Sequence, residues 1–228
     1  MIPSIPGLFQ EDFKVYEDAF LYQTDAKLEP LALLVEDHRT TRIRIRKSRL
    51  PHLNFLTDYP DLDALDLSKT TVGNWEESIF RSLPNLRQLV VPQTGFQAAV
   101  RLSSMKMLDS LDLSGNALDR IPKLPASLTW LDLSNNAIDD FLPLGTLKKL
   151  NTLLADGFQG KHLNGLEHLI NLKAIQMDNS PKLAELGALT NLNLRQISFA
   201  KCNIKGIQVF AGHQELDYMD LTHNWVSD

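Results

Sequence analysis

Hydrophobic and polar positions alternate over short segments that recur along the chain. In the segment LTWLDLSNNAI, Leu131 and Leu133 are apolar, while Trp130 and Asp132 take the alternate positions. This period of two predicts a short strand whose leucines face a core and whose other side chains face outward. Each recurrence of the segment therefore predicts one strand.

After each strand the apolar spacing changes from two residues to three. One strand is followed by apolar residues at every third position: Ile138, Phe141, Leu144, Leu147 and Leu150. This spacing favours a 3₁₀-like or short helical segment that returns the chain to the next strand. Two units differ in length. The shorter unit, Ala117 to Leu131, contains the pairs Ile121-Pro122 and Leu124-Pro125. In the longer unit, Asn74 to Leu83 predicts a helical turn.

One position near the end of each predicted strand recurs at nearly constant spacing. It is occupied in turn by Ser48, Thr70, Thr94, Asn116, Asn136, Phe158, Ser180, Cys202 and Asn224, which we call the asparagine slot. Successive intervals are 22, 24, 22, 20, 22, 22, 22 and 22 residues. Nine units in register indicate a repeat protein. The pattern L-x-x-L-x-L-x-x-N-x-L resembles the leucine-rich repeat, with Phe158 as a departure that puts the local loop geometry in question.

The resemblance implies an α/β solenoid with a curved parallel sheet on its concave face and 3₁₀, short helical or extended segments on its convex side. We expect residues 40–228 to form about nine repeats. Residues 1–39 would be a lead-in and cap, with 18–39 as a degenerate repeat. The 22-residue class resembles bacterial internalins and a regulator of protein phosphatase-1. The 20-residue unit resembles the repeats of secreted bacterial effectors, in which Leu-Pro pairs mark an extended return. This resemblance implies an extended return here and favours a bacterial source.

Composition narrows the environment of the protein. Hydrophobic residues make up 43% of the 228 positions, and we find neither an 18-residue apolar run nor a secretory signal pattern. A single cysteine cannot form an internal disulfide. These features predict a cytoplasmic protein that does not enter a membrane, with a secreted effector as the alternative. The net charge of -5 argues against nucleic acid as a partner.

The outward positions of the predicted strands give a candidate docking surface. Trp130 and Leu154 are apolar residues that the pattern places outside the core, among polar neighbours. Exposed aromatic side chains are enriched at interface hot spots, although a lone tryptophan can also lie flat over its neighbours. We expect a protein partner with basic groups, because aspartates lie side by side in this sheet. The predicted partner-binding residues are Trp130, Leu154, Asp112, Asp132, Asp156, Asp178, Gln176 and Tyr218.

A stripe of arginines projects from the first strong repeat. Arg42, Arg44 and Arg46 occupy alternate positions of one predicted strand, beside Asp66 in the next. The stripe either pairs with nearby acidic residues or holds an anion such as phosphate or nucleic acid.

The sequence contains no catalytic or metal-binding pattern that we recognise. Its six histidines lack ligand spacing, and we expect no cofactor and no enzyme activity in this segment. Cys202 occupies the asparagine slot, which predicts a buried structural thiol. The principal hypothesis is a protein-binding scaffold, and the alternative is the recognition part of a larger enzyme such as an effector ubiquitin ligase. Met219 and Leu221 would lie at an open edge where copies could associate.

Overall fold

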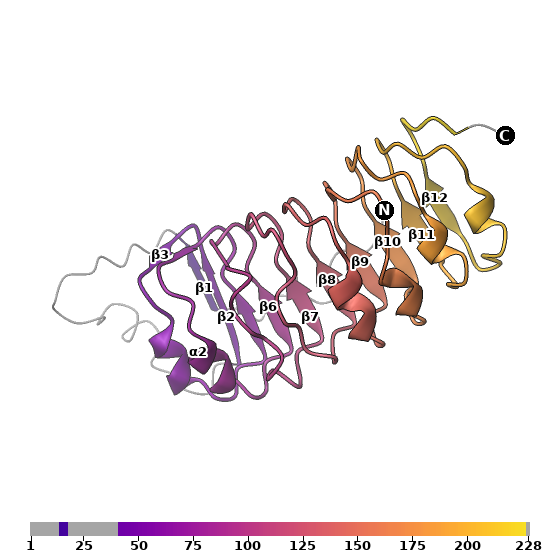
Figure 1. The fold of residues 1–228 in the computed structure, drawn as a ribbon. Coiled ribbons are helices and arrows are strands. Elements are labelled where there is room, and N and C mark those ends of the chain that lie inside the picture. The colour runs from indigo at the N-terminus through magenta and orange to yellow at the C-terminus, as the bar shows by residue number, and fades with distance from the viewer. Residues whose placement is uncertain (1–13, 18–40, 227–228) are drawn as a thin grey trace.

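Ten parallel strands, one from each turn of the chain, form a single sheet in the computed structural model (Figure 1). The structure describes residues 14–17 and 41–226. The strands follow in spatial order β1 (Lys14–Glu17), β2 (Arg42–Arg46), β4 (Ala64–Asp66), β6 (Gln88–Val90), β7 (Ser110–Asp112), β8 (Trp130–Asp132), β9 (Thr152–Leu154), β10 (Ala174–Gln176), β11 (Gln196–Ser198) and β12 (Tyr218–Asp220). Because each strand pairs with the next one along the chain, equivalent positions of successive units lie side by side.

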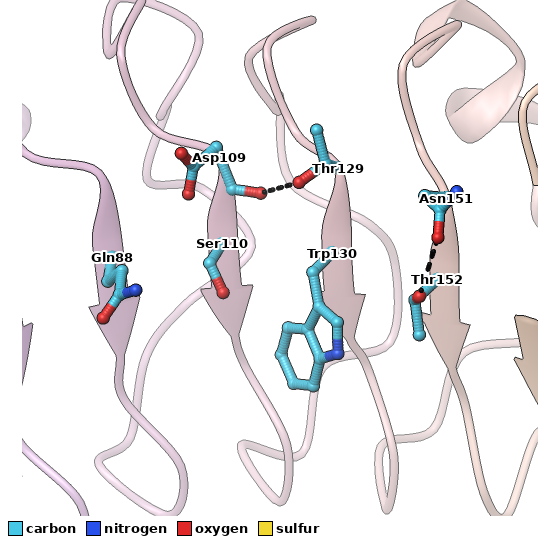
Figure 2. A pocket seen from close by; sticks show the side chains of 7 residues that line it. All are labelled: Gln88, Asp109, Ser110, Thr129, Trp130, Asn151 and Thr152. Atoms are coloured by element: carbon cyan, nitrogen blue, oxygen red, sulfur yellow. Dashed lines mark hydrogen bonds between the residues drawn. The ribbon is translucent and has the colours of Figure 1, made fainter. Parts of the chain in front are cut away.

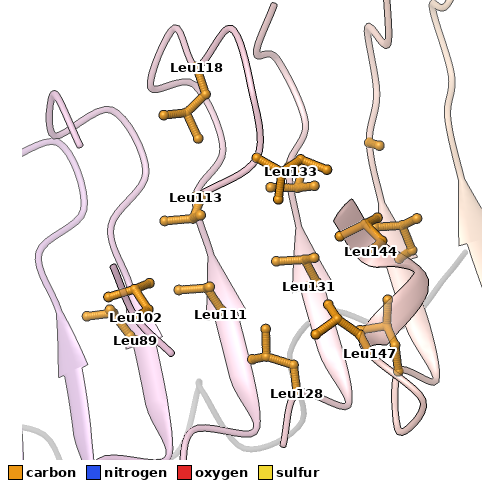
Figure 3. Packing of buried hydrophobic residues seen from close by; sticks show 14 of the residues in the cluster. Leu89, Leu102, Leu111, Leu113, Leu118, Leu128, Leu131, Leu133, Leu144 and Leu147 are labelled. Carbon is orange, nitrogen blue, oxygen red and sulfur yellow. The ribbon is translucent and has the colours of Figure 1, made fainter. Parts of the chain in front are cut away.

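The core lies between the sheet and the segments that return the chain. In the three-residue strands from β4 to β11 the central residue points into it, and Leu111, Leu131 and Leu153 pair in register and are fully buried. Figure 3 shows Leu111 and Leu131 stacked from unit to unit beside leucines of the return segments such as Leu147. Burial of one leucine stabilises the fold by about 1.5–3 kcal/mol, so each unit depends on its two neighbours for its apolar contacts.

The return segments confirm the 3₁₀ or short helical structure that the three-residue apolar spacing predicted. Five are short 3₁₀ helices: η1 (Asn54–Asp58), η2 (Leu142–Thr146), η3 (Leu166–His168), η4 (Gly187–Leu189) and η5 (Gln208–Phe210). The 24-residue unit forms the predicted helical turn as α2 (Glu77–Arg81), and β3 (Arg49–Leu50) pairs with β5 (Thr71–Val72) beside it. The 20-residue unit returns without regular secondary structure while Ile121 stays buried, as its prolines predict.

Side chains of the asparagine slot join neighbouring units through buried hydrogen bonds. Asn136 Nδ2 donates to the carbonyl oxygens of Leu113 and Leu133 at 3.1 and 2.8 Å. Its Oδ1 accepts the backbone N–H groups of Asn116 and Leu118, each at 3.0 Å. One side-chain amide thus provides hydrogen-bond partners for four backbone groups in two units. These groups have no partner from a neighbouring strand at this turn.

Other residues fill the slot by different means. Cys202 is buried, and its Sγ lies 3.2 Å from the carbonyl oxygen of Met177, so the predicted structural thiol is confirmed. Phe158 turns into the core instead and stacks on Phe141 with ring centroids 4.2 Å apart. The loop closes without a slot amide because the backbone N–H of Phe158 bonds to the carbonyl oxygen of Ala155.

The residue before the slot has a left-handed backbone in all nine units. Gly115 and Gly157 hold this position in two of them. The other seven use non-glycine residues with φ between 51 and 59°: Lys47, Lys69, Gln93, Asn135, Asn179, Lys201 and His223. A positive φ is uncommon outside glycine, so the turn geometry overrides the local preference of these side chains.

The structure tests only part of what was predicted for residues 1–39. Strand β1 lies inside the segment expected to be a lead-in and pairs in parallel with β2, so the sheet begins before residue 40. The degenerate repeat predicted for 18–39 lies outside the described residues. In the part of the chain that the structure describes, no helix has both the length and the apolar character needed to cross a membrane.

Replacing Asn136 by alanine should lower the free energy of unfolding by about 2–4 kcal/mol. The change leaves two buried N–H groups and two buried carbonyl groups without their partner, and each such loss costs roughly 1–3 kcal/mol before the loop relaxes. Urea denaturation followed by circular dichroism measures the difference. Asn54→Ala, at an exposed position in η1, is the control. Equal midpoints for the two variants would contradict the role of the slot.

Candidate functional site

The sheet face opposite the core carries three rows of side chains, which we call the open face. Register places Ser110, Trp130 and Thr152 in the first row and Asp112, Asp132 and Leu154 in the second. Asp156 and Asp178 follow β9 and β10 in the third row. Among the predicted partner-binding residues, the structure therefore brings the four aspartates, Trp130 and Leu154 together, as expected.

The expectation that Trp130 projects into solvent was wrong. Its side chain is only 6% exposed and contacts Val90 on β6 and Leu154 on β9. The physical reason is the size of its neighbours: Ser110 and Thr152 are small, so the indole lies down on the sheet in the space beside them (Figure 2). Tyr218 has no such cover and is 36% exposed at the last strand.

The indole lies across the two aspartates of the second row. Val90, Asp112, Asp132 and Leu154 are register partners on four successive strands. Strands lie about 4.8 Å apart, so Val90 and Leu154 are too distant to touch, and both reach Trp130 instead. A ring that contacts both ends of this row must span its middle, the positions of Asp112 and Asp132.

Hydrogen bonds hold the aspartates of the open face in fixed orientations. Asp112 and Asp132 each accept the N–H of the serine two residues further on at 2.8 Å. Asp156 and Asp178 accept backbone N–H groups from the following unit, also at 2.8 Å. Gln176 donates to Asp156 at 2.8 Å. These carboxylates therefore support the turns as well as charging the surface.

Burial and mutual repulsion raise the pKa of three of these groups. Desolvation is the largest cause for Asp132, whose pKa rises to about 7 with further contributions from the charges of Asp112 and Asp156. The pKa of Asp112 is raised by desolvation and by the charge of Asp66, against the hydrogen bond from Ser114. The pKa of Asp156 is raised for the same kind of reason. A cation placed on this row would reverse the repulsion.

A hollow of about 400 Å³ lies beside the indole on the amino-terminal side of the strands (Figure 2). Six of the seven residues that line it are polar, and Trp130 is the seventh: Gln88, Asp109, Ser110, Thr129, Trp130, Asn151 and Thr152. Desolvation raises the pKa of Asp109, which the Arg87 guanidinium 4.0 Å away counteracts. The sequence pattern did not reveal this hollow, because the residues that precede each strand had no assigned direction.

The arginine stripe pairs with an aspartate inside the protein. Arg44 Nε lies 2.9 Å and an Arg46 guanidinium nitrogen 2.7 Å from Asp66 Oδ2, whose side chain is 1% exposed. Burial alone would raise the pKa of Asp66, but hydrogen bonds from Ser68 and the Arg46 charge lower it. Arg42 lies 3.5 Å from Asp63. The internal pairing considered for this stripe is thus present, and anion binding stays a prediction.

Strand β12 is the last strand that the structure describes, and association of copies at its edge stays a prediction. Met219 is 41% exposed and Trp225 is 74% exposed, and Leu221 is half-buried. Among residues 14–17 and 41–226, no three or more His, Cys, Asp or Glu side chains form a group that could hold a metal ion.

Comparison with known proteins agrees with the repeat geometry. The family described as Leucine Rich Repeat matches residues 127–150, the segment that contains β8 and the 3₁₀ return η2. The chain folds as a leucine-rich repeat solenoid. Its structure is similar to that of an internalin from Listeria monocytogenes, with a TM-score of 0.72 and 16% identity over 84% of this chain and 56% of that one. The leucine-rich repeat domain of APL1B gives a TM-score of 0.68 with 16% identity, covering 83% and 56%.

Sequence relatives of the solenoid include Epiphycan from Homo sapiens, which is 23% identical over 198 residues. The match covers 83% of this chain and 52% of Epiphycan, so the chain spans about half the length of that relative. The sequence relatives are vertebrate proteins, from human, mouse and chicken. They lend no support to a bacterial source or a cytoplasmic location, and both stay predictions.

Replacing Asp132 by asparagine should stabilise the solenoid at pH 8 by roughly 1–2 kcal/mol. One pKa unit corresponds to about 1.4 kcal/mol, reduced here by partial exposure. A carboxyl whose folded pKa is raised to about 7 stabilises the fold fully below its unfolded pKa, and this stability is lost as pH rises through 7. Asparagine keeps an oxygen for the N–H of Ser134.

Urea denaturation at pH 5 and pH 8 measures this effect. Asp119→Asn, with a side chain 74% exposed, is the control for loss of one negative charge. A difference between wild type and Asp132→Asn that does not grow from pH 5 to pH 8 would show that Asp132 is not destabilised by ionisation.

Proposed function

We propose that the solenoid is a protein-binding scaffold whose open face, from β7 to β12, docks a basic segment of a partner. The observation that carries this proposal is the distribution of charge. The three outward rows of these six strands hold five aspartates and no lysine or arginine: Asp112, Asp132, Asp156, Asp178 and Asp220.

The orientation of the carboxylates supports binding rather than general solubility. Asp156 and Asp178 are tied to the backbone of the next unit at 2.8 Å, so their side chains need little ordering when a partner arrives. Preorganised groups avoid the entropy cost of fixing rotamers in the complex. Adjacent carboxylates in neighbouring strands also repel each other, and a basic partner relieves that repulsion.

Related proteins give the proposal its general class. The internalin and Epiphycan are similar to this chain over most of its length but are themselves longer. Repeat solenoids present extended surfaces for partners, although their fold does not identify the partner. We therefore derive the basic character of the partner from this chain alone. If the chain is the recognition part of a larger enzyme, the same face would bind the substrate of that enzyme.

The double variant Asp156→Asn, Asp178→Asn should bind the partner at least about tenfold more weakly than wild type, since charge-assisted hydrogen bonds are worth about 1.5–3 kcal/mol. Asparagine retains the oxygen that accepts the backbone N–H, so the fold is kept while two charges are removed. Affinity capture from extracts of the source organism identifies candidates, and calorimetry on the purified pair measures the affinity.

Asp139→Asn, Asp140→Asn is the matched control, because both aspartates are exposed on the return side. Affinity should also fall steeply with added salt. If the control variant loses the partner as much as the open-face variant, or neither variant loses it, docking on the aspartates of the open face is wrong. Loss of the partner on mutation of Arg42 and Arg46 instead would favour the anion-binding alternative.

A further inference from the structure

The covered state of Trp130 leaves polar groups without partners. Its Nε1 is buried and makes no hydrogen bond among the described residues, and Ser110 Oγ beside it is buried and unbonded in the same way. The two side chains are 6% and 5% exposed. A buried polar group without a partner costs about 1–3 kcal/mol, so the position of the indole over the sheet carries a cost.

The indole also imposes a cost on the groups beneath it. Its contacts with Val90 and Leu154 place it across the positions of Asp112 and Asp132, which are register partners on β7 and β8 and cannot both be ionised at low cost in a desolvated position. The charges that face this pair come from several elements. Asp66 on β4 faces Asp112 and is itself held by Arg44 and Arg46, and Asp156 beyond β9 faces Asp132.

An alternative position for the indole exists in the same structure. The hollow beside Trp130 has a volume of about 400 Å³, which lies within the range of about 300–1,000 Å³ found for ligand pockets, so it has room for the ring. Oxygen atoms of Asp109, Thr129 and Asn151 line it and can accept a hydrogen bond from an N–H group. Figure 2 shows these residues grouped at the amino-terminal ends of β7, β8 and β9, away from the indole.

We propose that Asp112 and Asp132 form a binding site for one cationic side chain, an arginine or lysine of a partner, and that Trp130 is a movable cover over this site. The indole moves into the neighbouring hollow when the cation enters. This proposal rests on the proposed function and specifies its central contact. In the open state both carboxylates are ionised and bridged by the cation, and Ser110 Oγ is uncovered.

The shift of Asp132 toward a pKa of about 7 agrees with this arrangement, since a closed cover favours the protonated carboxyl and a cation favours the ionised one. Cation binding and the position of the indole are thermodynamically linked, so a cation that favours the ionised carboxyl also favours the open position of the indole. Removing the cover must therefore lower the pKa of Asp132, and it must also remove the cost of opening that a cationic ligand has to overcome.

The variant Trp130→Thr tests both consequences, because the neighbouring unit already carries Thr152 at the register position. The first measurement is the pKa of Asp132 by carboxyl carbon NMR in the free protein. We expect it to fall by about one unit or more in Trp130→Thr, as expected when desolvation is relieved. Asp220, in the same row on β12 and remote from Trp130, should keep its pKa.

The second measurement is binding of a hexa-arginine peptide, with hexaglutamate as the control. Trp130→Thr should bind hexa-arginine about tenfold more tightly than wild type, because a site that is closed in most molecules shows an affinity reduced by its open fraction. Asp112→Asn, Asp132→Asn should lose this binding. In wild type the indole N–H signal that is missing in Trp130→Thr should shift on addition of the peptide.

The outcomes separate the two proposals. Weaker binding by Trp130→Thr, with an unchanged pKa of Asp132, would make the indole an ordinary contact and overturn the cover while leaving the docking surface intact. Unaltered binding by Asp112→Asn, Asp132→Asn would overturn the cation site. Absence of hexa-arginine binding by every variant would also overturn it, and the protein-docking proposal would then depend on the capture experiment. If Trp130→Thr does not fold, the indole shift in wild type decides, and an unmoved indole signal at saturation overturns the cover.

Discussion

Exact registration between successive turns of the chain is the constraint on which this structure depends. A strand of three residues makes few hydrogen bonds, so its backbone is satisfied only if the next unit places an equivalent strand beside it. The slot amides extend the same pairing into the turn, where Asn136 joins two units. Units of 20, 22 and 24 residues keep this register because they differ only on the return side.

Much of the fold could be predicted from the sequence, because units that stack in register repeat their apolar residues at a regular spacing. In the ten-stranded sheet, every strand from β2 onward was predicted from apolar spacing and slot identity, as were the 3₁₀ returns, the helical turn in the 24-residue unit and the buried Cys202. The short pair β3 and β5 was not predicted. The left-handed residues before the slot were not predicted. Four of the nine, Lys47, Lys69, Gln93 and Lys201, have no intrinsic preference for positive φ, so only the closed turn reveals it.

The open face was predicted less completely, since periodicity fixes which side a residue occupies but not where its side chain lies. Trp130 is on the predicted face, yet the free volume over Ser110 and Thr152 lets the indole lie down. The same limit applies to Asp66. Its position beside Arg44 follows from register, but its nearly complete burial depends on how Arg44 and Arg46 fold over it.

The column of left-handed residues has a consequence for how this protein can change over evolution. Seven of nine units place a non-glycine residue at a positive φ, a conformation that costs roughly 1–2 kcal/mol per residue. Glycine or asparagine in place of the lysines and the glutamine among them, Lys47, Lys69, Gln93 and Lys201, would recover part of that energy without altering a core contact or an open-face side chain. Such substitutions would raise the free energy of unfolding, and this gain could offset destabilising changes on the binding surface during evolution.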